Sequence, residues 1–514
     1  MMLKNFNKNI VIIDFGSQYT HLITKKVRGL GVYSEIVSPE TKIDEIVSLK
    51  PKGIILSGGP CSVYEKDALF PNKEIFKLGI PVLGICYGFQ LIVKMLGGRI
   101  ARGTLGEFGR NEIKVVKKSL LFDSIPKRSI MWMSHNDYVD KMPAGFNITS
   151  ISENGLIASI EEDNIFGLQF HPEVNHSEFG KEIISNFLFK ICKVSPSWSI
   201  SDFAVAKINE IRETAKESKV ISGLSGGVDS SVATILASKA LGKNLIPVFV
   251  DTGLLRKNEA IELLDVFRRD LRLKVLFVDA KKQFLDNLKG VSLPEKKRKI
   301  IGREFIKVFE KVAKDEGDIK YLVQGTLYPD VIESKKGGKY SAKIKSHHNV
   351  GGLPKNMKFV LIEPLRELFK DEVRVLGKEL GIPEKILARH PFPGPGLAIR
   401  IIGKITEERL NTLREADYIF LEELSKAGLY DKVWQAFCVF LPVKTVGVMG
   451  DKRTYDSVIV IRIVQSSDGM TADWAKVPFD FLKKVSSRII NEVTSVNRVT
   501  YDISSKPPAT IEWE

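Results

Sequence analysis

Short, wholly apolar runs separated by amphipathic segments dominate the first part of the chain. Ile10–Ile13, Gly53–Leu56 and Pro81–Ile85 predict buried strands, and Phe89–Leu96 predicts a helix. Strands without polar alternation are typical of parallel sheets that helices cover on both faces. The pattern therefore predicts a first α/β domain with a largely parallel sheet.

A second α/β domain is predicted after Ser195–Ser199, a segment with the composition of a linker. Strands are expected at Val220–Ile221 and Leu245–Val250, with a helix between them at Ser231–Leu241. This order is a βαβ unit. The string RHPFPGPG at 389–396 is rich in proline and glycine and marks the end of this domain.

The remainder predicts a small α+β domain. The pattern predicts helices at Glu407–Ala427 and Phe479–Val493. Along the chain, an apolar strand at Val458–Val464 lies between them, and a last strand follows at Arg498–Ile503. A domain of this size should not bury both faces of Val458–Val464, so we expect a homodimer through it. The fold class is α/β, with two doubly wound, mostly parallel-sheet domains (1–195 and 196–388) followed by a small α+β dimerisation domain (389–514).

Composition narrows the class of protein only slightly. Hydrophobic residues make up 44% and charged residues 27%, which is ordinary for globular proteins, and the net charge is +15. The basic excess is spread along the chain, which favours small polyanionic ligands over nucleic acid. The four cysteines lack C-x-x-C spacing, and no window predicts a membrane span or a signal peptide, so we expect a cytoplasmic protein without a membrane partner.

The string Gly84-Ile85-Cys86-Tyr87-Gly88 stands between a predicted strand and a predicted helix. Flanking glycines permit a sharp turn that presents the middle side chain, and a helix N-terminus favours a thiolate. His171 follows another apolar run, and Glu173 lies where it can orient the imidazole ring. The glycines of LSGGP (56–60) suit an oxyanion hole. Together these motifs predict a cysteine nucleophile with a histidine base.

At this point the chain resembles the class I glutamine amidotransferases. The matching strings are IDFGSQY (13–19), LSGGP (56–60), GICYGFQ (84–90) and QFHPE (169–173). The resemblance implies that Cys86 attacks glutamine with His171 as the base. It also implies that Gly59 and Tyr87 supply oxyanion N–H groups, and that Gln90, His135 and Asp137 bind glutamine. Many members have glycine where this chain has Asn136, and asparagine tolerates the positive φ that such a loop can require.

The string LSGGVDSS (224–231) joins a strand to a helix in the second domain. Its glycines let backbone N–H groups approach a phosphate, the helix N-terminus adds a favourable field, and Asp229 can hold Mg²⁺. The string is not a Walker A motif. It resembles the PP-loop of ATP pyrophosphatases, which adenylylate a carbonyl oxygen and release pyrophosphate. That resemblance implies a Mg²⁺ cofactor held by Asp229 and Asp371. The expected ATP-binding residues are Ser225, Gly226, Gly227, Val228, Asp229, Ser230, Ser231, Asp251, Gly325 and Lys370.

The combination of both domains resembles the GMP synthetase family over essentially the whole chain. Diagnostic strings are QGTLYPDVIES (324–334), KSHHN (345–349), RHPFPGPGLAIR (389–400), VGVMGDKR (446–453) and SKPPATIEWE (505–514). The resemblance implies glutamine, ATP and XMP as substrates. It implies XMP contacts at Arg298, Asp451, Arg453, Lys506, Ile511 and Glu512. In the tail, Lys506 suits the phosphate, Glu512 suits the purine N–H edge, and Trp513 is expected to be the apolar anchor.

Two other interpretations remain open on the sequence. One is another PP-loop amidotransferase, such as an NAD synthetase, or a tRNA-thiolating enzyme; the elbow at Cys86 and the absence of tRNA-binding modules argue against these. The other is a regulator that binds nucleotides without turnover, which the set Cys86, His171, Glu173 and Asp229 disfavours. We also expect a mobile lid at Lys335–Lys358, because the segment is rich in lysine and glycine and poor in apolar residues.

Overall fold

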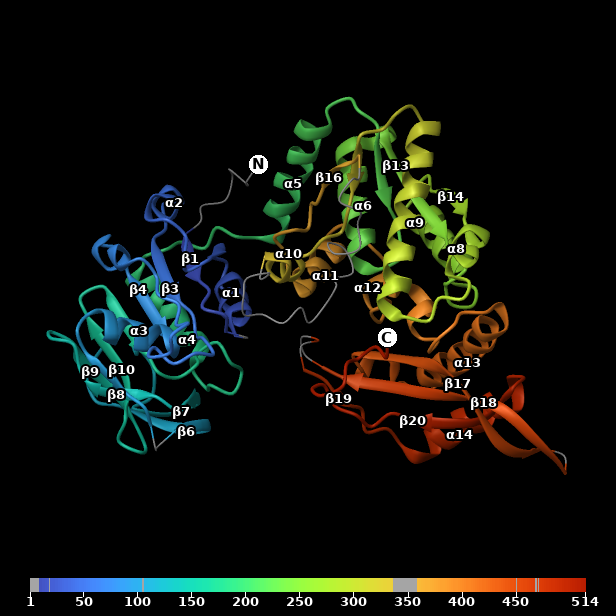
Figure 1. Cartoon of the computed structure of the whole chain (residues 1–514). Coiled ribbons are helices and arrows are strands. Elements are labelled where there is room, and N and C mark those ends of the chain that lie inside the picture. Colours follow the sequence, from blue (N-terminus) through green and yellow to red (C-terminus); the bar gives the residue numbers. More distant parts are fainter. Residues whose placement is uncertain are drawn as a thin grey trace. The chain divides into compact units, whose positions relative to one another are not determined.

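The computed structural model of the chain describes residues 9–17, 19–103, 106–335, 358–449, 451–466, 469 and 471–514. The chain divides into two compact units, Met1–Asp202 and Phe203–Glu514, whose elements are labelled in Figure 1. Apart from its end residues, the predicted lid at 335–358 lies outside the described residues. Among the described residues, no helix is both long enough and apolar enough to span a bilayer.

A nine-stranded mixed sheet forms the centre of the first unit, in the order β2-β1-β3-β4-β11-β10-β9-β6-β7. The parallel half contains β1 (Ile10–Ile13), β2 (Ser34–Val37), β3 (Gly53–Leu56), β4 (Val82–Ile85) and β11 (Ile165–Leu168). The antiparallel half contains β6 (Glu107–Val115), β7 (Arg128–His135), β9 (Asn147–Ser152) and β10 (Ile157–Glu162). A separate ribbon pairs β5 (Arg99–Ala101) with β8 (Tyr138–Lys141).

Helices cover both faces of the parallel half, because successive side chains of its strands point to opposite faces. Ile10 and Ile12 pack in one core with α1 (Thr20–Gly29) and α4 (Gly180–Asn186). Val11 and Ile13 pack in the other core with α2 (Ile43–Ser48) and α3 (Tyr87–Met95). This is the doubly wound arrangement that the continuous apolar runs predicted. A 3₁₀ turn (Lys73–Lys77) precedes β4, and a π-helical turn (Phe187–Ile191) continues α4.

The second unit begins with a five-stranded, wholly parallel sheet in the order β14-β13-β12-β15-β16. Its strands are β12 (Val220–Gly223), β13 (Leu245–Asp251), β14 (Leu276–Asp279), β15 (Tyr321–Val323) and β16 (Val360–Ile362). Its helices are α5 (Ile200–Ala215), α6 (Val228–Leu241), α7 (Glu259–Asp265), α8 (Lys281–Leu288), α9 (Pro294–Asp315), α10 (Tyr328–Lys335), α11 (Lys370–Glu379) and α12 (Glu384–Leu387). The chain leaves β12 toward β13 on one side and returns to β15 on the other, which is where open α/β sheets bind ligands.

The end of the chain forms a four-stranded sheet built on a long hairpin (Figure 1). Its elements are α13 (Glu407–Lys426), β17 (Gln435–Met449), β18 (Lys452–Gln465), β19 (Asp473–Trp474), α14 (Phe479–Glu492) and β20 (Val496–Tyr501). One hydrophobic core runs from Ile221 and Val248 of the parallel sheet to Ile459 and Ile461 of β18. The described chain therefore shows no break at 388/389, and the three-domain division stays a prediction.

We expected a dimer because Val458–Val464 should keep one face unburied within a single chain, and this reason is wrong. Val458–Val464 is buried within the unit, because α13 and α14 cover one face of the sheet and the chain's last residues cover the other. On that second face Phe437, Val439 and Val460 form a small core against Ile511. Exposed apolar side chains lie instead on the outer half of the hairpin, at Val443, Val446, Val448 and Tyr455.

Candidate functional site

Cys86 occupies a strained turn between β4 and α3. Its φ is 53° and its ψ is −106°, a conformation that residues with a Cβ rarely adopt. A Cβ on Gly84 would lie 2.5 Å from the carbonyl oxygen of Gly88, and a Cβ on Gly88 would overlap the carbonyl oxygen of Leu56. The two glycines thus allow α3 to pack closely on β3 and β4, and they place the thiol at the start of the helix.

His171 and Glu173 follow β11, which pairs in parallel with β4. His171 Nδ1 donates to Glu173 Oε1 at 2.8 Å, and both side chains are buried. Burial of the ring opposes its charged form, but the Glu173 carboxylate and the Cys86 thiol together raise the pKa of His171 well above its ordinary value. The ring is therefore suited to take the proton of the Cys86 thiol. The three residues predicted as the catalytic set lie together.

A buried serine that the sequence analysis missed holds this histidine in place. Ser177 Oγ donates to the carbonyl oxygen of His171 at 2.7 Å and accepts from the backbone N–H of Trp132 at 3.0 Å. The ring of Tyr19 meets the His171 ring edge-on, with 5.0 Å between centroids. A single serine four residues after Glu173 carries no motif, so only the fold identifies it.

Gly59 and Tyr87, the predicted oxyanion pair, are in contact. A Cβ on Gly59 would lie 3.0 Å from the Tyr87 ring and 3.1 Å from the carbonyl oxygen of Phe15. Tyr87 immediately follows Cys86 at the first position of α3. Glycine at 59 thus lets the loop lie close to the start of α3, where the predicted N–H donors are expected, and a side chain there would be tightly packed.

The predicted glutamine-binding residues also converge. Gln90 Nε2 donates to the carbonyl oxygen of Asp137 at 3.1 Å, and His135 Nδ1 lies 3.0 Å from the same oxygen. Ser62 Oγ donates to the Asp137 carboxylate. Asn136 is not among the positive-φ residues found in the described chain, so the loop does not use the conformational tolerance that was expected of asparagine.

The predicted PP-loop lies at the carboxyl end of β12, the central strand of the parallel sheet. Gly226 has a φ of 80°, and Gly227 precedes the first turn of α6. The Ser225 and Ser230 hydroxyls are 2.9 Å apart, and Ser231 Oγ donates to the carbonyl oxygen of Gly227 at 2.8 Å. The loop is therefore preformed, with a helix N-terminus available for an anion.

Asp229 lies in the first turn of α6 and pairs with Lys370 from the first turn of α11. Lys370 Nζ donates to Asp229 Oδ2 at 2.9 Å. The second oxygen, Asp229 Oδ1, is buried and has no hydrogen-bond partner among the described residues. A Cβ on Gly325 would lie 2.9–3.0 Å from the backbone of Asp229 and Ser230. Asp371 follows Lys370 in the first turn of α11, so the predicted ATP and metal residues gather at one edge of the sheet.

Asp251 closes the adjacent strand β13, as predicted. Its Oδ1 accepts from the backbone N–H of Gly253 at 2.9 Å, and its Oδ2 pairs with Lys281 at 3.2 Å. Arg389 donates to the carbonyl oxygen of Gly226 at 3.3 Å and pairs with Glu259. The string containing Arg389 was expected to be a break between domains, whereas in the structure Arg389 supports the PP-loop.

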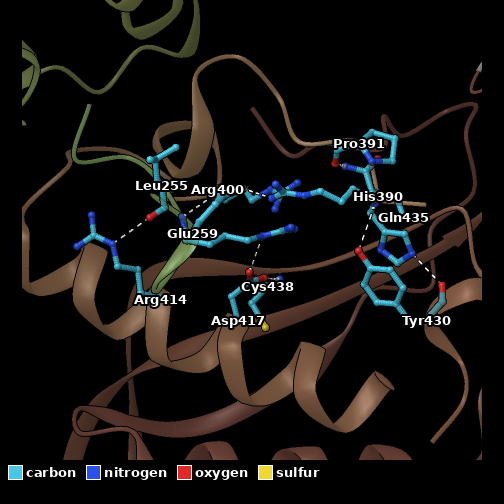
Figure 2. Close-up of polar contacts among 12 residues, drawn as sticks. Leu255, Glu259, His390, Pro391, Arg400, Arg414, Asp417, Tyr430, Gln435 and Cys438 are labelled. Atoms are coloured by element: carbon cyan, nitrogen blue, oxygen red, sulfur yellow. Dashed lines mark hydrogen bonds and ion pairs between the residues drawn. The ribbon is translucent and has the colours of Figure 1, made fainter. Parts of the chain in front are cut away.

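Polar contacts join the loop after β13 to the C-terminal sheet (Figure 2). Arg414 of α13 donates to the carbonyl oxygen of Leu255 at 3.1 Å. Arg256 lies 3.0 Å from Asp417, which also accepts the N–H of Cys438 at 2.8 Å. The buried guanidinium of Arg256 and that of Arg400 lie 4.8 and 5.1 Å from the ring of Phe392. The loop after β13 and the C-terminal sheet are thus joined by one network of polar contacts.

Buried cations hold the last residues of the described chain. Arg400 binds both carboxylate oxygens of Glu512, at 2.9 and 3.1 Å. Lys297, which is fully buried, pairs with the Glu514 side chain, and Arg298 donates to the backbone carbonyl oxygen of Glu514. The predicted tail anchor Trp513 is 39% exposed; the apolar anchor is Ile511 instead.

The predicted XMP residues fall into two separate groups. Arg298, Lys506, Ile511 and Glu512 belong to the tail and its supports, and Lys506 Nζ donates to the carbonyl oxygen of Gly469 at 2.7 Å. Beside the tail lies an open hollow of about 540 Å³. Its lining residues are Val460, Thr500, Tyr501, Asp502, Ile503, Ser504, Ala509, Thr510, Glu512 and Trp513.

Asp451 and Arg453 lie at the turn of the β17–β18 hairpin, where Val448 pairs with Arg453. Glu512 contacts Gln435, at the opposite end of β17. A strand of 15 residues spans on the order of 45 Å. Within one chain, Asp451 and Arg453 therefore lie far from Glu512.

Comparison with known proteins matches three family models. Glutamine amidotransferase class-I matches residues 11–191, NAD synthase matches residues 201–289, and the GMP synthase C terminal domain matches residues 422–513. Full-length relatives named GMP synthase (glutamine-hydrolyzing) include those of Aquifex aeolicus and Chlorobaculum tepidum. Each is 57% identical to this chain, over 98% and 99% of it respectively and over 99% of the relative. The relative from Thermosipho melanesiensis is also 57% identical, over 99% of this chain and all of its own length.

Proposed function

Because the chain belongs to the family of glutamine-hydrolysing GMP synthases, we propose that Cys86, His171 and Glu173 release ammonia from glutamine and that the site around Asp229 activates XMP with ATP. The family consists of ligases that join carbon to nitrogen, with XMP, ATP and glutamine as substrates and GMP, AMP, pyrophosphate and glutamate as products. The NAD synthase model matches only the segment that carries the PP-loop, whereas the GMP synthase relatives match the whole chain.

The buried contact between Cys86, His171 and Glu173 is the observation that carries the glutaminase assignment. In the first step His171 takes the thiol proton, and the sulfur attacks the side-chain amide carbon of glutamine. His171 then returns the proton to the departing ammonia, which leaves a glutamyl thioester. Water, activated by the same ring, hydrolyses the thioester to glutamate. Gly59 and Tyr87 N–H groups are proposed to stabilise the oxyanion in both steps.

The second site is proposed to form an adenylyl-XMP intermediate that ammonia attacks. Backbone N–H groups of Ser225–Val228 and the cation of Lys370 suit the phosphates of ATP. The residues present fit Mg²⁺, because Asp229 Oδ1 is buried and, in the part of the chain that the structure describes, has no hydrogen-bond partner; magnesium also takes few protein oxygens beside phosphate oxygens. Asp229, with Asp371 as the second expected ligand, would hold the ion. When bound, Mg²⁺ neutralises phosphate charge and favours departure of pyrophosphate.

We propose further that the tail forms the XMP site and that the enzyme is a cytoplasmic homodimer. Val443, Val446, Val448 and Tyr455 are each more than half exposed on the outer hairpin, which suits a second copy of the chain. The separation of Asp451 from Glu512 supports the same arrangement. Asp451 and Arg453 can contact XMP beside Glu512 only if the hairpin reaches the tail of the partner subunit.

The test of the assignment is the Cys86→Ala variant assayed with both nitrogen donors. We expect loss of GMP formation with glutamine and retained formation with ammonium salts, because the thiol is required only to release nitrogen. Products from the wild type with XMP, ATP, Mg²⁺ and glutamine should include AMP and pyrophosphate. Equal loss with both donors would contradict two separable sites, and release of ADP would contradict the adenylyl intermediate.

A further inference from the structure

Glu107 and His135 form a buried pair at the edge of the glutaminase sheet. They are directly opposed on the antiparallel strands β6 and β7. His135 Nε2 lies 3.1 Å from Glu107 Oε2, and both side chains are 2% exposed. The other ring nitrogen, Nδ1, lies 3.0 Å from the carbonyl oxygen of Asp137. Both nitrogens of one buried ring therefore face oxygen atoms.

The oxygen at Nε2 is that of an ionised carboxylate. Glu107 Oε1 accepts from Asn154 Nδ2 at 2.8 Å, so the second oxygen already serves as an acceptor. Burial raises the pKa of Glu107, but hydrogen bonds from His135, Ser152 and Asn154 outweigh burial and lower the pKa below its usual value. A backbone carbonyl cannot donate either. The Asp137 carbonyl can therefore bond only to a protonated Nδ1 of His135, and Glu107 is the group that faces the opposite ring nitrogen.

The carbonyl of Asp137 receives a second donor from α3, which begins directly after Cys86. Gln90 Nε2 donates to this carbonyl oxygen at 3.1 Å. Just before it in the chain, near the end of β7, the carbonyl oxygen of Ser134 accepts from Cys86 Sγ at 3.7 Å. The Asp137 side chain is bound by Ser62, which follows the LSGGP string (56–60). The His135–Asp137 segment is thus a wall of the glutaminase site, fixed from three directions.

We propose that Glu107 is a positioning residue of the glutaminase: it holds His135 so that Nδ1–H, together with the amide of Gln90, fixes the Asp137 carbonyl and the glutamine-binding segment around it. This inference rests on the proposed role of His135 and Asp137 in binding glutamine. Glu107 touches neither the nucleophile nor the base, so it acts on substrate affinity. Without its carboxylate, His135 Nε2 and Asn154 Nδ2 both lose their buried acceptor, and the ring is free to turn.

The test compares Glu107→Leu with Glu107→Gln. Leucine removes the acceptor, and we expect the KM for glutamine to rise on the order of 10-fold or more, since a buried polar group left unpaired costs about 1–3 kcal/mol. We expect kcat at saturating glutamine to change much less. Glutamine at 107 can donate to His135 Nε2 and accept from Asn154, with Nδ1–H still on the Asp137 carbonyl, so this variant should stay close to the wild-type KM.

Two internal controls accompany these variants. Glu112 lies on the same strand and pairs with Arg128 at the surface, so Glu112→Leu should leave the KM for glutamine unchanged. GMP formation from ammonia reports on the fold and on the synthetase site, and it should be unchanged in every variant. Cys86→Ala in the same assay tests the proposed function separately, because its loss of glutamine-dependent synthesis does not depend on Glu107.

A spectroscopic measurement tests the pair without a mutation that could disturb folding. In the wild type, ¹⁵N spectra of labelled histidine should show Nδ1 of His135 protonated and hydrogen-bonded, and Glu107→Gln should keep this proton on Nδ1. A wild-type ring whose Nδ1 carries no proton would overturn the proposal. So would an unchanged glutamine KM in Glu107→Leu, or an equal rise in KM in Glu107→Gln and Glu107→Leu.

Discussion

Arg400 and Glu512 form a two-point ion pair in which the arginine side chain is fully buried. The guanidinium also faces the rings of Phe437 and Phe392, and Glu512 accepts from Gln435 Nε2 at 2.8 Å. A buried charge of this kind is stable only while its partner stays in place. The position of Glu512 is therefore fixed by Arg400 and Gln435, and the tail is part of the folded unit rather than a frayed end.

Lys506→Ala is expected to weaken XMP binding. Removing a charge-assisted contact to a phosphate costs about 1.5–3 kcal/mol, which corresponds to a rise in the XMP KM of about 10–150-fold. The KM for ATP should change much less. Steady-state kinetics with varied XMP at saturating ATP measure the effect, and Lys483→Ala, at an exposed position on α14, is the matched control. An unchanged XMP KM in a folded protein would mean that the tail is structural only.

Asp229→Asn is expected to abolish GMP formation from both glutamine and ammonia. The amide keeps the shape of the carboxylate and its position beside Lys370, but it lacks the charge that a metal ion requires. Pyrophosphate release at millimolar Mg²⁺ is the measurement, with Asp286→Asn on the surface of α8 as the control, since Asp286 pairs only with Lys282 among the contacts described. Pyrophosphate release at the wild-type rate would remove Asp229 from the metal site.

Glu173→Gln should shift the pH dependence of the glutaminase. Burial opposes the charged form of His171, and Glu173 is the largest of the causes that raise its pKa, so removing the carboxylate lowers that pKa. The charged ring stabilises the fold fully below its ordinary pKa, and this stability is lost as pH rises through the raised value. We therefore expect the alkaline limb of kcat/KM for glutamine to move to lower pH, while the ammonia-dependent profile stays unchanged. An unmoved limb would show that Glu173 does not set the charge of His171.

Mixed dimers test whether the hairpin acts on the partner subunit. We expect Arg453→Ala and Lys506→Ala to be weakly active alone, and a mixture of the two to regain activity after subunit exchange. If the hairpin completes the partner's site, one of the two sites in a mixed dimer carries neither substitution. If each chain completed its own site, both sites would stay impaired and mixing would restore nothing. Sedimentation of the wild type as a monomer at micromolar concentration would also contradict the arrangement.

The strength of local signals explains how far the sequence predicted the fold. The apolar runs located β1 and β3 at their observed residues and β13, α13 and α14 to within one residue. The antiparallel half of the first sheet was not predicted, because β6, β7 and β9 alternate or mix polar and apolar residues, and the Asn154-Gly155 turn between β9 and β10 was overlooked. The long hairpin was missed for a similar reason, since the outer parts of β17 and β18 are largely polar or exposed.

The candidate site shows the same division. Residues inside dense motifs, such as Cys86 and Asp229, were found because glycine spacing reports on backbone geometry. Glu107, Ser177 and Arg389 were missed because their partners are brought to them by strand pairing or by distant loops. The dimer argument misjudged Val458–Val464 because burial of a strand's second face depends on a tail more than forty residues later, at Ile511.

The strained backbone at Cys86 lowers the stability of the fold at the position that carries the nucleophile. A residue with a Cβ in such a conformation costs on the order of 1–3 kcal/mol, and glycine would relieve it at once, together with the nucleophile. Selection for stability alone would therefore remove the cysteine, and only a continued need for nitrogen from glutamine retains it. In a lineage supplied with ample ammonia, position 86 is where we would expect activity to be lost first, with a gain in melting temperature.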